Sequence, residues 1–303
     1  MSTFMGVKLL SSLLGRYCSA AIMKDPLRKF AGKRFAIDAS NCIYRFLYDD
    51  TLIPSMYEFC VTLAHYNIKL VFVFDGQFTT QKKSVVAERR KEREKARLTY
   101  DTLMQQSNAN PDEIKIAKRK MARMTTKHVT EVKELLTALG IPYIEAKKEA
   151  DEICAELVIN GEAYACVSGD TDMFVYGCPR VIRYLSIRKH TCVMFDLEGI
   201  LNSLSLSFDE FKDVCMVAGT DYNEANLNMY TAYKLWSEYK SEPNESCFCD
   251  WLVFRGIFNT KETMIQGRAI YDTEKETSYE CIDKEVDHEQ LEIILRRHNF
   301  INS

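Results

Sequence analysis

Seven acidic residues are the side chains of this 303-residue chain whose type and spacing could do chemistry. Each follows an apolar run or opens a helical pattern: Asp38, Asp75, Glu149, Asp151, Asp170, Asp172 and Asp221. Two carboxylates about 4 Å apart repel each other by roughly 1–4 kcal/mol, and divalent cations remove that cost. Oxygen ligands without His or Cys select Mg²⁺ or its substitute Mn²⁺ over zinc. The set predicts two Mg²⁺ ions about 3.5–4 Å apart, an arrangement suited to phosphodiester hydrolysis.

Taken one at a time, these acids also have purely structural explanations. An aspartate that ends a strand, as at Asp38 and Asp75, often only caps a helix or shapes a turn. Glu149 and Asp151, in the first turn of a helix, would each gain about 0.3–1 kcal/mol from the helix dipole. The Asp-x-Asp pattern at 170–172 is more specific, although phosphatase-like and glycosyltransferase folds use it too. Convergence of the whole set on one cleft would decide in favour of metal.

Short apolar segments alternate with helical patterns and would position these acids. Strands are expected at 34–38, 69–75, 142–145 and 163–167, with a hairpin of 180–186 and 191–195. Helices are expected at 54–66, 82–105, 111–139, 149–160 and 208–218. This alternation predicts an α/β fold with a mainly parallel central sheet and helices on both faces. Ligands of such sheets bind beyond the carboxyl ends of the strands, where the acids lie.

Basic residues concentrate in one segment, although the whole chain carries a formal net charge of −3. Residues 77–133 contain fifteen Lys/Arg and seven Asp/Glu, so the remainder of the chain has a net charge of −11. Two basic helices beside an acidic cleft would clamp or thread a single nucleic-acid strand. A solvated surface helix and a nuclear-import signal at 118–120 are the alternatives.

The order and spacing of these blocks resemble the flap endonuclease/XPG family of structure-specific 5′ nucleases, in a divergent and minimal form of its core. The resemblance covers about 290 residues. It rests on residues 5–10, 35–40 with Tyr44, 71–76, 149–151, 170–172, 219–222 and 291–300. It implies a PIN-like 5′-nuclease fold with a helical arch at about 77–133. We expect a catalytic core over residues 1–206 and a helical DNA-binding region over 207–303, with a divergent helix-hairpin-helix and a closing helix.

The resemblance also implies roles for individual residues. The seven acids would hold the metals, with Asp221 beside the second ion. Lys82 and Arg89, at the base of the arch, would act in catalysis by gripping the scissile phosphate and stabilising developing negative charge. Tyr44 would stack on the nucleotide beside the cut. Further substrate-binding residues are expected at Arg90, Arg93, Lys118, Arg119 and Lys234.

The sequence departs from the family pattern after Asp221. Members of the family have a Gly-x-Gly turn there that binds potassium and a duplex phosphate, whereas this chain has no glycine between Gly219 and Gly256. Without glycine the backbone cannot approach a phosphate as closely. The departure argues against potassium binding and shifts duplex contact to Lys234. A sliding-clamp-binding peptide is not recognisable, so recruitment by that route is not expected.

The resulting expectation is a Mg²⁺-dependent nuclease that cuts DNA at 5′ flaps or 5′ ends during replication, repair or recombination. Its partner would be branched or 5′-ended DNA, and it would act as a monomer. A 5′→3′ exonuclease, a PIN-type ribonuclease and a catalytically silent junction-binding scaffold are the alternatives. The long basic segment argues against the ribonuclease, and the intact acid set argues against the scaffold.

Eleven scattered cysteines without a Cys-x-x-Cys pair indicate free thiols in a reducing compartment rather than a disulfide framework. The sequence has no signal peptide and no apolar run approaching the ~20 residues that span a bilayer. We therefore expect no membrane association. The expected location is intracellular, at sites of DNA replication, in the nucleus or in the cytoplasm if the protein is viral.

Overall fold

The computed structural model describes residues 6–47, 51–76, 83–106, 108, 110–220, 227–242, 246–272 and 279–300. The side chains of residues 83–89, Arg119 and Thr263 are also outside the description. Lys82 and Asp221 therefore lie outside the described residues, as do the side chains of Arg89 and Arg119.

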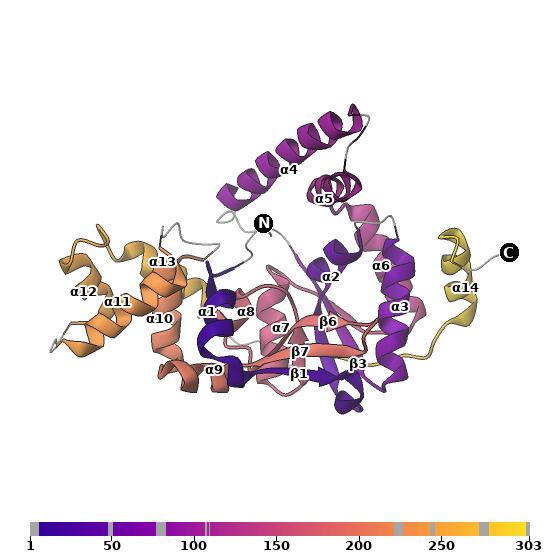
Figure 1. Ribbon diagram of the computed structural model, residues 1–303. Coiled ribbons are helices and arrows are strands. Elements are labelled where there is room, and N and C mark those ends of the chain that lie inside the picture. Colours follow the sequence, from indigo (N-terminus) through magenta and orange to yellow (C-terminus); the bar gives the residue numbers. More distant parts are fainter. Residues whose placement is uncertain are drawn as a thin grey trace.

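A seven-stranded sheet forms the centre of the described chain (Figure 1). Its order is β1 (Ile22–Pro26), β7 (Thr191–Asp196), β6 (Arg180–Ser186), β5 (Ala165–Val167), β2 (Arg34–Asp38), β3 (Lys69–Phe74) and β4 (Tyr143–Glu145). The five strands from β6 to β4 are parallel, and β7 and β1 add an antiparallel edge. The predicted fold class, a mainly parallel α/β sheet covered by helices, is confirmed.

The inner parallel strands β2, β3 and β5 are buried on both faces, and their successive side chains enter different cores. On β2, Phe35 and Ile37 enter one core while Ala36 enters the other. On β3, Phe72 and Val73 divide in the same way. Because side chains alternate along a strand, a run of apolar residues supplies both cores at once. This double burial fixes the register of the sheet and the position of its carboxyl edge.

One core is covered by α1 (Leu10–Tyr17), α7 (Ala150–Ile159), α8 (Asp172–Val175), α9 (Leu197–Leu204), α10 (Phe208–Ala218), α11 (Met229–Ser241), α12 (Phe248–Phe254) and α13 (Glu262–Tyr271). The other is covered by α2 (Ala39–Phe46), α3 (Leu52–His65), α6 (Thr126–Ala138) and α14 (His288–Arg297). Two 3₁₀ turns, η1 (Ser19–Ala21) and η2 (Leu27–Phe30), flank β1. None of the helices that the structure describes has the length and apolar character needed to cross a membrane. All eleven cysteines are described and carry free thiols, eight of them buried.

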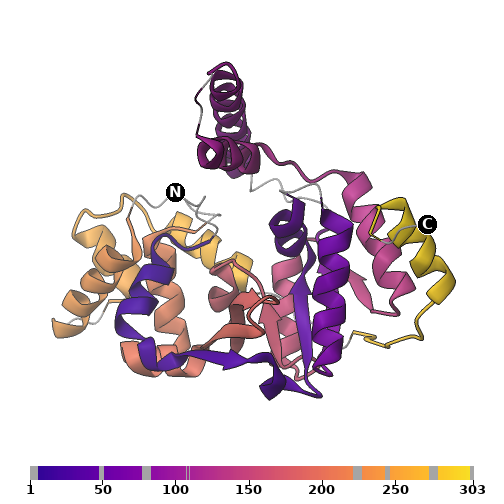
Figure 2. The same cartoon turned by 45° about the vertical axis from the view of Figure 1, so that its right-hand side comes forward.

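Two helices of the predicted basic arch, α4 (Lys83–Met104) and α5 (Pro111–Met121), stand away from the sheet. Figures 1 and 2 show them side by side above the end of the sheet where the parallel strands finish. Few of the side chains that the structure describes on these two helices are buried, so most of the described polar and basic ones face solvent.

The helical region expected over 207–303 occupies two places. Helices α10 to α13 lie beside α1, joined by hydrogen bonds from Lys8 N–H to the Gly219 carbonyl (3.3 Å) and from Met229 N–H to the Lys8 carbonyl (3.0 Å). The chain then returns across the sheet, where Lys284 N–H donates to the Gly140 carbonyl at 2.8 Å, and α14 packs on α6. All seven strands lie before residue 207, and the division into two domains remains a prediction.

The single helix predicted at 111–139 is wrong, because it is two helices, α5 and α6, separated at residues 122–125. Thr125 begins α6 with a capping box: His128 N–H donates to Thr125 Oγ1 (3.4 Å), and Thr125 N–H donates to His128 Nδ1 (3.2 Å). A threonine that satisfies the free N–H groups of a helix start can end one helix and begin another. The edge strand β1 was not predicted.

The capping role of Thr125 gives a first prediction. Thr125→Ala should lower the free energy of unfolding by about 1 kcal/mol, the usual cost of a lost N-cap. Thr130→Ala, an exposed position inside the same helix, is the matched control and should cost nothing, because alanine favours helix. Urea unfolding of both variants measures the difference. Equal stability of the two variants would contradict the assignment of the cap.

A second prediction concerns pH and the start of α10. Ser207 N–H donates to Glu210 Oε2 (2.8 Å) and Lys240 Nζ to Oε1 (3.0 Å). These contacts lower the pKa of Glu210 below its usual value, and the hydrogen bond from the Ser207 N–H has the largest effect. A lowered folded-state pKa adds stability above the unfolded pKa of about 4.3, and this stability is lost as pH falls through the folded-state value.

Glu210→Gln should therefore be less stable than the wild-type chain at pH 7. The difference in the free energy of unfolding between the two should become smaller toward pH 3. Free energies of unfolding from urea titrations at pH 3, 5 and 7 measure it. A gap that stays constant across this range would show that the charge of Glu210 plays no part.

Candidate active site

The acids lie where the order of the parallel strands reverses. From β2 the chain builds outward to β3 and β4, whereas β5 and β6 lie on the other side of β2. Asp38 is the last residue of β2, and Asp170 follows β5 by three residues. The carboxyl ends of the two strands on either side of such a reversal form a crevice in which open α/β sheets bind ligands.

Asp38 is buried, with 5% of its surface exposed, and has two hydrogen-bond donors. Asn41 N–H donates to Asp38 Oδ1 at 3.0 Å, so Asp38 is the N-cap of α2. Ser168 Oγ donates to Asp38 Oδ2 at 3.0 Å and comes from the loop that follows β5. The capping explanation of Asp38 is thus correct, and it coexists with a place in the acidic crevice.

Asp75 follows β3 and joins it to the start of α7. Ala150 N–H donates to Asp75 Oδ1 at 2.9 Å, and Ser40 Oγ donates to Oδ2 at 2.5 Å. The contact places Asp75 at the amino end of α7, because Ala150 stands between Glu149 and Asp151 in the sequence. Gly76 permits this approach, because a Cβ there would collide with the backbone before α7.

Asp170 and Asp172 are both buried, and the backbone of Gly6 lies close to both side chains. Asp172 N–H donates to Asp170 Oδ1 at 2.9 Å, which fixes the turn that begins α8. Gly6 has a φ of 80° and lies directly over the pair: a Cβ there would collide with Asp170 Oδ1 and lie 2.7 Å from Asp172 Oδ1. These two oxygens therefore face the same small volume beside Gly6.

The electrostatics of the crevice disfavour the ionised form of Asp38. Burial, followed by the negative charge of Asp75, raises the pKa of Asp38 to about 7, and the charge of Asp170 adds to the effect. The hydrogen bonds from Asn41 and Ser168 act in the opposite direction. A bound cation would favour the ionised form of such a group.

The donor set fits a hard divalent cation, although the side chains are not gathered around one. Six predicted ligands lie at the carboxyl edge, and all supply oxygen. Among the residues that the structure describes, however, no group of three or more His, Cys, Asp or Glu side chains is arranged to hold a metal ion. The seventh, Asp221, is outside the described residues.

The predicted substrate-binding residues that are described lie on three helices. Arg90 and Arg93 are on α4 and Lys118 is on α5, with Arg90 and Lys118 exposed. Lys234, whose side chain is 79% exposed, lies on α11 and pairs with Glu238 at 3.6 Å. Tyr44 is half-buried on α2, the helix that Asp38 caps.

Four further residues of the crevice were not predicted. Ser40 and Ser168 donate to the carboxylates described above, and Arg183 Nη2 donates to the Gly169 carbonyl at 2.7 Å. Burial lowers the pKa of the Arg183 guanidinium. Tyr271 OH, from α13, donates to Asp172 Oδ2 at 2.7 Å. The two serines lie within the acidic motifs and could have been found there, whereas nothing near Asp172 in sequence points to Tyr271.

Comparisons with known proteins identify the family of the chain. Residues 5–96 match the family model "XPG N-terminal domain", and residues 140–221 match "XPG I-region". Flap endonuclease 1 of Drosophila yakuba is 35% identical over 240 residues, which are 73% of this chain and 61% of that protein, less than two thirds of its length. Flap endonuclease 1 of Zea mays is 31% identical over 258 residues, or 78% of this chain and 68% of that protein.

A solved structure is similar over nearly the whole chain. Flap endonuclease-1 from Methanococcus jannaschii superposes with a TM-score of 0.68 at 25% identity, covering 95% of this chain and 93% of that one. Both family-model matches include acids of the crevice, from Asp38 and Asp75 to Asp170 and Asp172. The chain belongs to the flap endonuclease/XPG family of structure-specific 5′ nucleases.

Proposed function

We propose that this protein is a Mg²⁺-dependent nuclease that hydrolyses DNA phosphodiesters at 5′ flaps or 5′ ends in replication, repair or recombination. The observation that carries the proposal is the buried acidic crevice at one sheet edge, beneath two basic helices. Family membership supports the reaction class, since these nucleases depend on divalent metal, generally Mg²⁺. The substrate is branched or 5′-ended DNA.

Two Mg²⁺ ions are assigned to the seven acids: Asp38, Asp75, Glu149, Asp151, Asp170, Asp172 and Asp221. Bound there, or replaced by Mn²⁺, they would supply Lewis acidity and an activated water for in-line displacement at phosphorus. Ser40 and Ser168 orient Asp75 and Asp38, because each hydroxyl donates to one carboxylate oxygen and leaves the group fixed. The all-oxygen donor set and the raised pKa of Asp38 support this assignment.

The arch and its base supply positive charge to the substrate. Lys82 and Arg89 are assigned to the scissile phosphate, where a fixed cation stabilises the charge that develops in the transition state. Arg90 and Arg93 on α4, with Lys118 and Arg119 on α5, bind the phosphates of the single strand. Tyr44 stacks on the nucleotide beside the cut.

The remaining assignments concern the duplex and the molecule as a whole. Lys234 on α11 contacts the duplex in place of a glycine turn, within a helical DNA-binding region over residues 207–303. Residues 1–206 form the catalytic core. The protein works as a monomer at intracellular sites of DNA replication.

The decisive experiment compares substrates and metal. The purified chain should cut an end-labelled 5′ flap with Mg²⁺ but not with EDTA, and Asp170→Ala should lower the rate by more than about 100-fold, beyond the 10–100-fold usual for an outer-shell change. Asp250→Ala, which removes a carboxylate in α12 paired with Lys261, is the matched control and should cut normally. Melting temperatures check that both variants are folded.

Nicked DNA, single-stranded DNA and RNA, tested in parallel, separate the alternatives. Metal-dependent cutting of RNA alone would replace the proposal by a ribonuclease. Cutting only from free 5′ ends would make the protein an exonuclease. Retained junction binding without cutting of any substrate would make it a scaffold.

A separate prediction addresses the arch. The double variant Arg90→Ala/Lys118→Ala should bind single-stranded flap DNA more weakly, and the slope of log affinity against log salt should fall by about 0.7 for each phosphate that the variant no longer neutralises. Fluorescence anisotropy at several salt concentrations measures both quantities. Lys24→Ala/Lys33→Ala removes two exposed lysines, one in β1 and one just before β2, as a control of equal charge. Identical slopes for the two double variants would rule out binding of the strand by the arch.

A further inference from the structure

Tyr271, the last residue of α13, reaches the acidic crevice from 99 positions further along the chain. Its hydroxyl donates to Asp172 Oδ2 at 2.7 Å. Both groups are buried, with 4% of Tyr271 and 2% of Asp172 exposed. The Thr220 side chain hydrogen-bonds to the same phenol. The hydroxyl therefore has a fixed direction. Because the hydrogen bond is shielded from water, it is stronger than the same bond at the protein surface.

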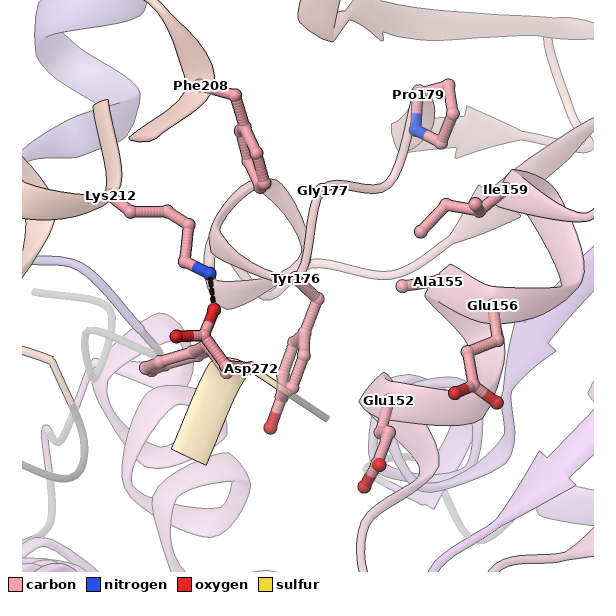
Figure 3. Close-up of a pocket in the computed structure, with 11 residues that line it drawn as sticks. Glu152, Ala155, Glu156, Ile159, Tyr176, Gly177, Pro179, Phe208, Lys212 and Asp272 are labelled. Carbon is pink, nitrogen blue, oxygen red and sulfur yellow. Dashed lines mark hydrogen bonds and ion pairs between the residues drawn. The ribbon is translucent and has the colours of Figure 1, made fainter. Parts of the chain in front are cut away.

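The tyrosine ring is held in place by its neighbours. The ring of Tyr176 lies 4.8 Å from it, centroid to centroid, at an interplanar angle of 59°. Both rings line a cavity of about 430 Å³, and Figure 3 shows Lys212 and Asp272 joined at its wall. The ion pair between Lys212 of α10 and Asp272 fixes the residue that follows Tyr271. Two independent anchors thus set the position of the hydroxyl.

The two carboxylate oxygens of Asp172 have different neighbours. Oδ2 accepts from Tyr271, whereas Oδ1 lies in the small volume beside Gly6 that it shares with Asp170 Oδ1. A carboxylate with one oxygen held this way cannot rotate without breaking the bond. The orientation of Oδ1 toward Asp170 is therefore set by Tyr271.

We propose that Tyr271 is a positioning residue that holds Asp172 so that Asp172 Oδ1 and Asp170 Oδ1 together face a divalent cation. The inference rests on the proposed function, since it assigns both aspartates to the metal site. It adds that the helical region α10–α13 contributes to metal affinity and does not only bind DNA. Hydrogen-bond partners of metal ligands commonly have this effect, because they fix the ligand's orientation.

The test measures metal binding directly, without cleavage. Tyr271→Phe keeps the ring and removes only the hydroxyl, so it should weaken Mn²⁺ binding by about 10–100-fold in isothermal titration calorimetry of the full chain. A second measurement is the rise in melting temperature on adding Mn²⁺, taken relative to the same variant in EDTA. The rise should be smaller for Tyr271→Phe, because stabilisation by a ligand follows its affinity.

Tyr279→Phe is the matched control. Its hydroxyl also donates to a buried carboxylate at 2.7 Å, that of Glu156 on α7, which is not assigned to the metal. Both variants lose one phenol–carboxylate hydrogen bond, so a general loss of packing would affect them alike. Tyr279→Phe should bind Mn²⁺ with wild-type affinity.

Each outcome decides the matter. Mn²⁺ affinity of Tyr271→Phe within about twofold of the wild type, or an equal loss in Tyr279→Phe, would overturn the positioning role and leave the proposed nuclease intact. Failure of the wild-type chain to bind Mn²⁺ would overturn both the role and the metal assignment. A wild-type chain that binds Mn²⁺ but cuts no DNA would refute the proposed function alone.

Discussion

Repulsion between carboxylates gathered at one sheet edge is the constraint on which the rest of this structure depends. The crevice brings Asp75 and Asp170 close enough to buried Asp38 for their negative charges to raise its pKa, after the larger effect of burial. Neutral groups donate hydrogen bonds to these carboxylates. The Asn41 N–H and the Ser168 hydroxyl donate to Asp38, and the Ala150 N–H at the start of α7 donates to Asp75. Each donor belongs to a different element from its acceptor, which ends or follows a strand. The same hydrogen bonds that limit the repulsion therefore also join sheet, loops and helices.

The sheet supports this arrangement because both of its faces are filled. On one face, burial of the Phe35 and Ile37 side chains of β2 stabilises the fold by about 1.5–3 kcal/mol each. Ala36 packs on the other face. A strand held from both sides cannot shift its register without exposing apolar surface. Asp38 is the next residue after this buried run, so its place in the crevice follows from packing that lies well away from it.

The acids that follow strand ends could be predicted from the sequence. The start of α6 and the strand β1 could not, because they depend on capping geometry and on pairing with a distant strand. Asp38 and Asp170 could be placed because each follows an apolar strand, and parallel strands finish at one edge. The break before Thr125 could not, because the residues just before it are compatible with a helix and only the capping geometry reveals the stop. The strand β1 carries Lys24, Asp25 and Pro26 and has no alternating pattern; it is a strand because β7 offers an open edge.

The return of α14 across the sheet has a consequence for the synthesis of the protein. Leu291, Ile294 and Leu295 cover a core that also contains Val132 and Leu135 of α6, made more than 150 residues earlier. During synthesis, the part of this core that α14 covers stays exposed until residues 288–297 have been made. The nascent chain thus exposes apolar side chains of α6 from the time that helix is made until α14 packs on it, and a chaperone would be most useful during that interval.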